Sequence, residues 1–269
     1  MFEEFFGFER TPFGKDVPVH QLFLSQQYEE AIARMRYVAQ NRYFGLLTGE
    51  VGSGKSSALR HLRSKLDPAR FECLYLADSG LTPHSFYQEL GIQLGMRPPY
   101  QRSAAKRLVH EALMERYEVH GKIPVVIVDE AHLLSPTMLE EVRFVTNFEM
   151  DSFSPMALIL SGQPELRRIL RLQAFAAIDQ RIQVRFHLGG LTHEETKGYI
   201  AHHLRVAGVG HPVFTDEAIG LIHKFTAGIA RRINNLCTTC LLAAYSKGTK
   251  LVDDELVKQV AVGEFDLGE

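Results

Sequence analysis

Short apolar runs alternate with helix-forming stretches over the first two thirds of the chain. Residues 43–48 form one such run, end in a glycine-rich turn, and are followed at 56–66 by leucines at helical spacing. Further apolar runs occupy residues 71–76, 123–128, 156–160 and 182–188. The run at 123–128 is rich in β-branched residues and apolar on both faces, as a central parallel strand requires. The pattern predicts an α/β fold in three layers, with a five-stranded parallel sheet covered by helices on both faces.

Helix-start signals separate the predicted strands. Thr82 and Ser135 each precede a proline, and such a pair is typical of a helix cap and its first residue. A long helix is expected over residues 103–120. Beyond Gly190 the strands stop, Thr192 opens a capping box, and helical periodicity continues to the end. We therefore expect an α/β domain over residues 1–190 and a small all-helical domain over residues 191–269.

Composition narrows the class of protein. The 269 residues are 45% apolar and 23% charged, which is typical of a globular protein that folds in water. No apolar run reaches the roughly 18 to 20 residues of a membrane span, and the acidic, aromatic start MFEEFFGFER does not resemble a signal peptide. Three cysteines suit reduced thiols better than a disulfide framework. We expect a cytoplasmic protein with no membrane partner.

The turn after the first predicted strand matches the phosphate-loop pattern G-x-x-x-x-G-K-[ST] and lies between a strand and a helix, as the pattern demands. Its glycines let backbone N–H groups converge on phosphates, Lys55 can reach the β- and γ-phosphates, and Ser56 can offer its hydroxyl to Mg²⁺. We expect ATP and Mg²⁺ as ligands. The predicted nucleotide-binding residues are Gly49, Glu50, Val51, Gly52, Ser53, Gly54, Lys55, Ser56 and Ser57.

The buried strand at 123–128 delivers two adjacent carboxylates at its carboxyl end, where α/β sheets place their ligands. We assign Asp129 to magnesium, together with Ser56, and Glu130 to polarising the attacking water. The simpler alternative is that both acids cap the following turn. With Ala131 and His132 these acids also spell a helicase box, but the remaining chain is too short for the second domain that a helicase needs.

Several segments together resemble one family, the AAA+ ATPases of the ExeA-like and transposition-helper (TnsC-like, Mu B-like) group. The resemblance covers nearly the whole chain and rests on Phe5-Phe6-Gly7 with Thr11-Pro12-Phe13, TGEVGSGKS, VVIVDEAH, LILSGQPEL, Gln180-Arg181, LGGLTHEE and GIARRINNLC. The first domain then becomes an AAA+ ATPase domain and the second its helical lid. The resemblance implies that residues 1–40, including Phe13, lie near the adenine; core packing is the simpler interpretation of these aromatics.

The resemblance also assigns roles to polar residues outside the two motifs. Gln163 is similar to a sensor of the γ-phosphate, with Ser161 as the alternative. Arg181 is similar to an arginine finger that completes a neighbouring subunit's site. On the lid, Arg231 or Arg232 is similar to a second sensor, although Ala230 stands where the family usually has proline. For the arginines, a solvated surface charge is the alternative.

Two functions remain open for such an ATPase. A third alternative is that ATP binding acts as a structural switch and little ATP is hydrolysed. Of the two functions, one is a regulator of DNA transposition that assembles as a ring or filament on duplex DNA and recruits a transposase. The other is an ExeA-like ATPase of a general secretion (type II) pathway. Those secretion proteins continue into a membrane span and a peptidoglycan-binding domain, whereas this sequence ends at Glu269, so we favour transposition.

A net charge of −2 means that any DNA contact must come from local charge. The candidates for sequence-independent phosphate contacts lie in a basic stretch without acids, Arg97, Arg102, Lys106 and Arg107. A second basic run, Arg167, Arg168 and Arg171, is expected near a subunit interface. Solvated helix faces are the alternative for both. Cys237 and Cys240 have metal-pair spacing but no second pair nearby, so we expect a packed helix face.

Overall fold

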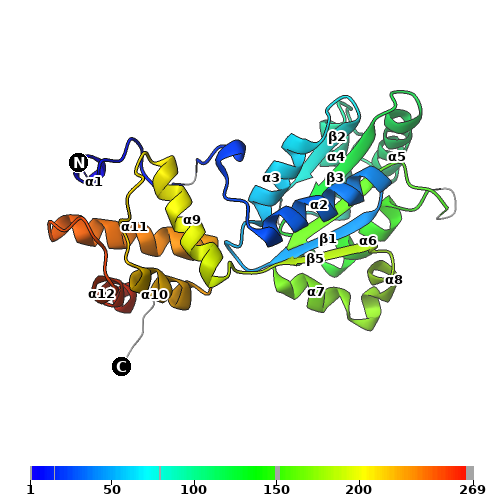
Figure 1. Cartoon of the computed structure of the whole chain (residues 1–269). Helices are drawn as coiled ribbons and strands as arrows, with labels where there is room; N and C mark the ends of the chain where they lie inside the picture. The colour runs from blue at the N-terminus through cyan, green and yellow to red at the C-terminus, as the bar shows by residue number, and fades with distance from the viewer. Residues whose placement is uncertain (1, 15, 79, 149–151, 265–269) are drawn as a thin grey trace. The chain divides into compact units, whose positions relative to one another are not determined.

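The structure is a computed structural model, and it describes residues 2–14, 16–78, 80–148 and 152–264. Strands alternate with helices up to residue 188 and only helices follow (Figure 1). The strands are β1 (Phe44–Gly49), β2 (Phe71–Leu76), β3 (Ile123–Val128), β4 (Ala157–Gly162) and β5 (Val184–Leu188). The α-helices are α1 (Phe2–Phe6), α2 (Gln26–Asn41), α3 (Lys55–Lys65), α4 (Pro83–Gln93), α5 (Arg102–Glu118), α6 (Pro136–Val145), α7 (Pro164–Leu170), α8 (Ala176–Asp179), α9 (His193–Val206), α10 (Asp216–Thr226), α11 (Ala230–Ser246) and α12 (Asp254–Glu264). Short 3-10 turns, η1 (Val19–Gln21), η2 (Ala131–Leu133) and η4 (Gln173–Phe175), lie between them.

The five strands form one parallel sheet in the order β2-β3-β4-β1-β5, as the sequence predicts. The chain leaves β1 for the far edge of the sheet and returns through β3 and β4, so β1 lies between β4 and β5. Consequently the carboxyl ends of β1, β4 and β3 are neighbours at one edge. In open α/β sheets this edge is where ligands bind.

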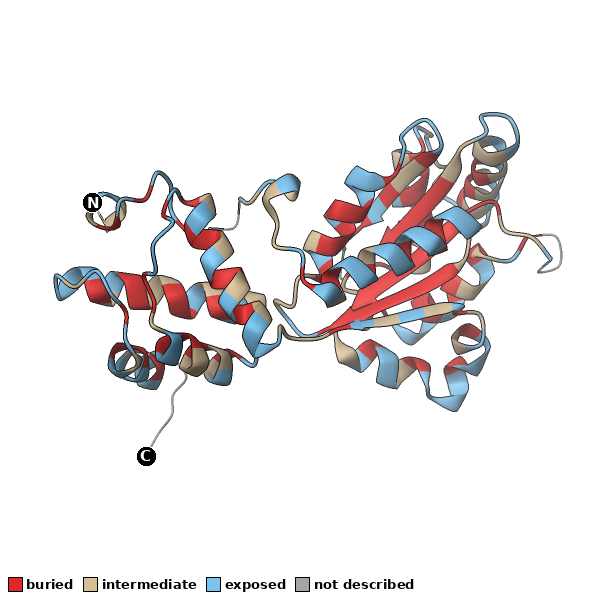
Figure 2. Ribbon diagram, in the orientation of Figure 1, coloured by how far each residue is buried: buried red, intermediate tan, exposed pale blue. Residues whose placement is uncertain are grey.

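Successive side chains of each strand point to opposite faces of the sheet, so an apolar core lies on each face. Val126 and Val128 of β3 belong to the apolar cluster formed with α4 to α8, whereas Val125 and Ile127 belong to the cluster formed with α2 and α3. All four side chains are buried, and Figure 2 shows β3 in the buried colour. A strand in this position is therefore apolar at every residue, which explains the continuous run in the sequence.

The predicted helix starts are confirmed. The Thr82 hydroxyl accepts the Ser85 amide at 3.2 Å at the start of α4, and the Ser135 hydroxyl accepts the Met138 amide at 3.2 Å at the start of α6. At α9 the Thr192 hydroxyl accepts the Glu195 amide, and the Glu195 carboxylate accepts the Thr192 amide, which completes the capping box.

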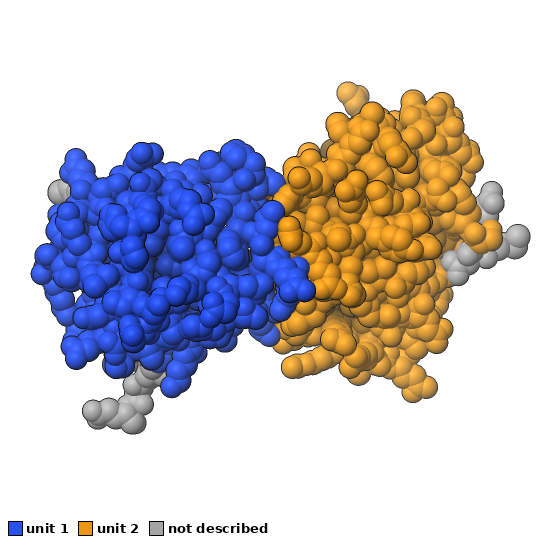
Figure 3. Space-filling model, in the orientation of Figure 1, with its two compact units in different colours: residues 1–27, 50–54, 189–269 blue, residues 28–49, 55–188 orange. Residues whose placement is uncertain are grey.

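The chain divides into two compact units, drawn in different colours in Figure 3. The sheet unit comprises residues 28–49 and 55–188, and the helical unit comprises residues 1–27, 50–54 and 189–269. Phe6, Phe8 and Phe13 are buried in the core of the helical unit with residues of α9 to α12. The domain boundary near residue 190 stays a prediction.

Two further sequence expectations concern the helical unit and the membrane. Cys237 and Cys240 are fully buried in the core of the helical unit, as expected for a packed face of α11. Across the described ranges, no helix has both the length and the apolar character needed to cross a bilayer.

Candidate nucleotide site

The phosphate-loop motif connects the end of β1 to the start of α3. Gly49 is the last residue of β1 and Lys55 is the first residue of α3, so the five residues between them make the turn. Gly52 and Gly54 have φ of +82° and +104°, a region that side chains with a Cβ rarely enter. The motif requires glycine at the second of these positions, and the structure shows why both are glycines.

Gly52 also approaches α11, which lies in the same helical unit. Its carbonyl accepts the Arg231 amide at 3.1 Å, and a Cβ added to Gly52 would lie 2.5 Å from the Arg231 Cβ. Of the two arginines that the sequence leaves open as lid sensor, Arg231 is the one whose backbone contacts the loop. Its sensor role stays a prediction.

Within the sheet unit, the side chains of Lys55 and Ser56 form hydrogen bonds at the ends of two strands. The buried Lys55 ammonium donates to the Gly49 carbonyl at 2.8 Å, so its charge stays beside the loop. The Ser56 hydroxyl donates to Asp129 Oδ2 at 3.1 Å. The fold thus brings together the hydroxyl and the carboxylate that we assigned to magnesium, although 73 positions separate them in sequence.

Asp129 has a second hydroxyl donor that sequence reasoning missed. Tyr75 of β2 donates to the same Oδ2 at 2.8 Å, while Oδ1 accepts the Glu130 amide at 3.0 Å. Burial, and then the hydrogen bond to Asp129, raise the pKa of the Tyr75 hydroxyl, so it remains a donor. One feature of the sequence could have identified Tyr75. It lies near the carboxyl end of its strand, and the parallel strand beside it ends just before Asp129.

Glu130 directly follows Asp129 in an unusual backbone conformation. Its φ of 51° and ψ of 31° are left-handed, which is uncommon for a residue other than glycine. Its side chain is 43% exposed, so water can reach the carboxylate. One carboxylate oxygen lies 3.4 Å from Nδ1 of His132, a residue that we considered only as part of a helicase box.

Of the two candidate γ-phosphate sensors at the end of β4, Gln163 lies outside the strand and Ser161 within it. The Gln163 amide donates to His132 Nδ1 at 3.4 Å, and Ser161 is fully buried. Because β4 lies between β1 and β3, Gln163 follows the strand between the two motifs. The choice of Gln163 stays a prediction.

Arg181 lies at the amino edge of the sheet, and Phe13 belongs to the helical unit. Arg181 precedes the amino end of β5, where its guanidinium donates to the Arg143 carbonyl at 2.8 Å. An arginine finger acts on a neighbouring subunit, so this placement leaves that role a prediction. Phe13 is buried in the helical unit and stacks on His203 with ring centroids 5.4 Å apart. It therefore packs as a core aromatic, and its contact with adenine stays a prediction.

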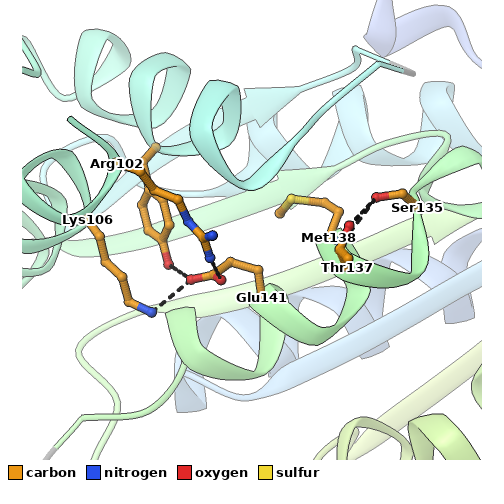
Figure 4. A network of polar contacts seen from close by, with 7 residues as sticks. Arg102, Lys106, Ser135, Thr137, Met138 and Glu141 are labelled. Atoms are coloured by element: carbon orange, nitrogen blue, oxygen red, sulfur yellow. Dashed lines mark hydrogen bonds and ion pairs between the residues drawn. The ribbon is translucent and has the colours of Figure 1, made fainter. Parts of the chain in front are cut away.

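The basic stretch assigned to DNA is in part an internal ion-pair network. Arg102 and Lys106 of α5 both bond the buried carboxylate of Glu141 on α6, Lys106 at 2.8 Å, and Tyr87 of α4 donates to it at 2.6 Å (Figure 4). Arg97 and Arg107 are exposed. The expectation overlooked Glu141 because it lies 39 positions after Arg102 in sequence.

Burial would by itself raise the pKa of the Glu141 carboxyl. Hydrogen bonds from Lys106 and Tyr87 outweigh that effect and hold this pKa below its ordinary value of 4.5. The carboxyl is therefore ionised at neutral pH, and its negative charge is balanced by the two cations of α5. This network is a structural feature of the three helices.

The residues at the carboxyl edge fit the ligands that the sequence predicts. A lysine beside a glycine loop suits polyphosphate. A hydroxyl and a carboxylate that share a hydrogen bond supply the hard oxygen ligands that Mg²⁺ prefers. Lys55, Ser56, Asp129 and Glu130 all belong to the sheet unit, so this part of the site is defined within one unit.

Comparison with known proteins identifies the class. Residues 37–170 match the family model of the AAA domain, and the fold of the chain is that of the P-loop AAA proteins. Among solved structures it is similar to Cdc6p from Pyrobaculum aerophilum, at 16% identity and a TM-score of 0.69, over 92% of this chain and 69% of that one. It is also similar to the Thermotoga maritima RuvB branch migration motor, at 16% identity and a TM-score of 0.59, over 88% of this chain and 69% of that one. At these identities the likeness shows the fold alone.

A curated relative is much more similar in sequence. The chain is 34% identical over 261 residues to General secretion pathway protein A of Aeromonas hydrophila. The match covers 95% of this chain and 47% of that protein, so the chain spans about half the length of this relative. The finding supports the ExeA-like part of the resemblance and not the transposition-helper part.

This relative also corrects two of our expectations. The preferred function, a regulator of DNA transposition, was wrong, because the relative is a protein of the general secretion pathway. For the same reason, duplex DNA and a transposase were wrong as partners. The choice had relied on where the sequence ends and on a basic stretch that in part pairs with Glu141. The secretion alternative is the one that the comparison favours.

Proposed function

We propose that this chain binds and hydrolyses ATP with Mg²⁺ as the ATPase part of a general-secretion protein. The observation that carries the proposal is the 34% identity over 95% of the chain to General secretion pathway protein A. That similarity extends through both compact units and is therefore not limited to the nucleotide motifs that many ATPases share. The geometry of the sheet unit supports the ATPase half of the proposal.

In this proposal each polar residue of the sheet unit has one task. Lys55 binds the β- and γ-phosphates, while Ser56 and Asp129 hold Mg²⁺, which neutralises charge on the transferred phosphoryl group. Glu130, with its exposed carboxylate, orients and polarises the attacking water. The hydroxyl of Tyr75 keeps the Asp129 carboxylate in place at 2.8 Å.

Phosphate release by the purified chain tests the ATPase half. Glu130→Gln should bind ATP normally but hydrolyse it on the order of 100-fold more slowly, because only the water-polarising carboxylate is lost. Lys55→Ala should lose tight binding instead. Glu140→Gln makes the same chemical change at an exposed position of α6 and should behave as the parent.

The secretion half is tested in cells with the same variants. A chimera in which this chain replaces the matching part of the Aeromonas hydrophila protein should restore protein export in a strain that lacks that protein. The Lys55→Ala and Glu130→Gln chimeras should not. A chimera that is produced and hydrolyses ATP but restores no export would refute the secretion role alone. Hydrolysis that Glu130→Gln leaves unchanged would refute the catalytic assignment.

A further inference from the structure

One ring nitrogen of His132 meets two polar groups. His132 lies in η2, and its side chain is only 8% exposed. Its Nδ1 is 3.4 Å from a carboxylate oxygen of Glu130 and 3.4 Å from the amide nitrogen of Gln163. The same atom therefore faces the proposed catalytic carboxylate and the backbone of the predicted γ-phosphate sensor.

These two contacts exclude each other chemically. An imidazole nitrogen either carries a proton and donates, or presents a lone pair and accepts. The Gln163 amide is a donor and needs the lone pair, whereas the ionised Glu130 carboxylate is an acceptor and needs an N–H. At any moment Nδ1 can therefore satisfy only one of its two neighbours.

The surrounding backbone holds the ring at this junction. Glu130 and Gln163 follow the neighbouring strands β3 and β4, which pair Val128 with Leu160. Gly162 allows the close approach: an added Cβ would lie 3.1 Å from the His132 amide nitrogen and 3.4 Å from its Nδ1. The left-handed conformation of Glu130 turns the chain directly into η2. A displacement of Gln163 would therefore change the hydrogen bonding of His132 Nδ1.

We infer that His132 is a positioning residue that couples Gln163 to Glu130, an inference that rests on the proposed ATPase function. When Nδ1 carries the proton, His132 donates to the Glu130 carboxylate and holds it in position to polarise water. When Nδ1 presents its lone pair, it accepts the Gln163 amide instead, and Glu130 loses this support. The two states of the neutral ring differ in tautomer, so the exchange moves one proton from Nε2 to Nδ1 through water and leaves the charge of the ring unchanged.

Three substitutions test the role of this single atom. Asparagine places its amide group at the same distance from Cβ as Nδ1, whereas glutamine reaches only the position of Nε2. His132→Ala and His132→Gln should lower kcat about tenfold, as is usual for groups that orient a catalytic residue, and His132→Asn should stay within about threefold of the parent. The Kd for ATP should not change, because His132 is not among the residues that we assign to phosphate or Mg²⁺. His120→Ala, which removes a surface histidine 3.8 Å from Glu115, is the matched control.

The outcomes separate this inference from the function on which it rests. Rescue by asparagine and not by glutamine, at unchanged ATP affinity and Tm, would support positioning through Nδ1. Parent-like kcat in His132→Ala would overturn it, as would His132→Asn with a kcat as low as that of the glutamine variant. If the alanine variant does not fold, the asparagine and glutamine pair decides. A parent chain that does not hydrolyse ATP would overturn the proposed function, and this inference with it.

Discussion

Among the described residues of the sheet unit, two buried carboxylates each bond a tyrosine hydroxyl, and they differ in their other hydrogen-bond donors. Tyr75 donates to Asp129 at 2.8 Å, and Tyr87 donates to Glu141 at 2.6 Å. Among the described residues, the remaining side-chain hydrogen bond to Asp129 comes from the neutral Ser56, whereas Glu141 bonds two cations. The charge of Glu141 is balanced by its own chain, while that of Asp129 suits a cation that arrives with the nucleotide. Charge balance therefore distinguishes a candidate site from a structural network better than burial does.

Removing the charge of each carboxylate should distinguish the proposed metal-binding role of Asp129 from the structural role of Glu141 most clearly. Asp129→Asn should reduce ATP hydrolysis on the order of 100-fold, because a neutral amide holds Mg²⁺ poorly. Glu141→Gln should leave hydrolysis within about twofold of the parent, because the network lies on helices outside the proposed site. Phosphate release at saturating ATP measures both. Comparable losses in the two variants would show that the comparison is mistaken.

The Glu141 network should instead be visible in stability. Glu141→Gln should lower the free energy of unfolding by about 2 kcal/mol at pH 7, because it leaves two cations without their counter-charge. For a chain of this size that corresponds to a Tm lower by about 5 °C. Glu140→Gln on the exposed side of α6 is the matched control and should unfold as the parent does.

The stability difference should also depend on pH. Because the folded-state pKa of Glu141 lies below its ordinary value of 4.5, its ionised form contributes stability above that value. The contribution is lost as the pH falls from 4.5 through the folded-state pKa. The Tm values of the parent and of Glu141→Gln should therefore converge in this acid range. A gap in Tm that stays constant down to the acid limit of folding would contradict the assignment.

Tyr75→Phe should have the smallest effect. It removes one of two hydroxyl donors from Asp129 while leaving the carboxylate and Ser56 in place. We expect the Mg²⁺ concentration for half-maximal hydrolysis to rise about threefold, with kcat nearly unchanged, as for groups that orient metal ligands. Tyr37→Phe is the control, because Tyr37 is 51% exposed on α2. A fall in kcat without a shift in the Mg²⁺ dependence would assign Tyr75 another role.

Local patterns were sufficient to predict the fold. Every strand has an uninterrupted or alternating apolar run, and Thr82, Ser135 and Thr192 cap helices with the residues that follow them. Such signals need only neighbours in sequence. The phosphate loop is local in the same sense, because its conformation depends on the positions of Gly52 and Gly54.

Contacts between distant segments were beyond that reasoning. The bond of Tyr75 to Asp129 depends on the pairing of β2 with β3. The pairing of Arg102 with Glu141 depends on a fold that brings side chains of α5 and α6 together. The role of His132 depends on the position of Gln163 beside it. The choice of transposition failed for a different reason, because neither a basic stretch nor the end of a sequence identifies a partner.

The burial of Phe6, Phe8 and Phe13 in the helical unit has a consequence for synthesis on the ribosome. These rings pack with residues of α9 to α12, and the Glu9 amide donates to the Ala207 carbonyl at 2.8 Å. At ordinary elongation rates, on the order of 10 to 40 s passes between translation of the first segment and that of its partners. The aromatic segment must remain soluble throughout this interval. Its interspersed glutamates, Glu3, Glu4 and Glu9, are the kind of charges that delay premature association of nascent chains.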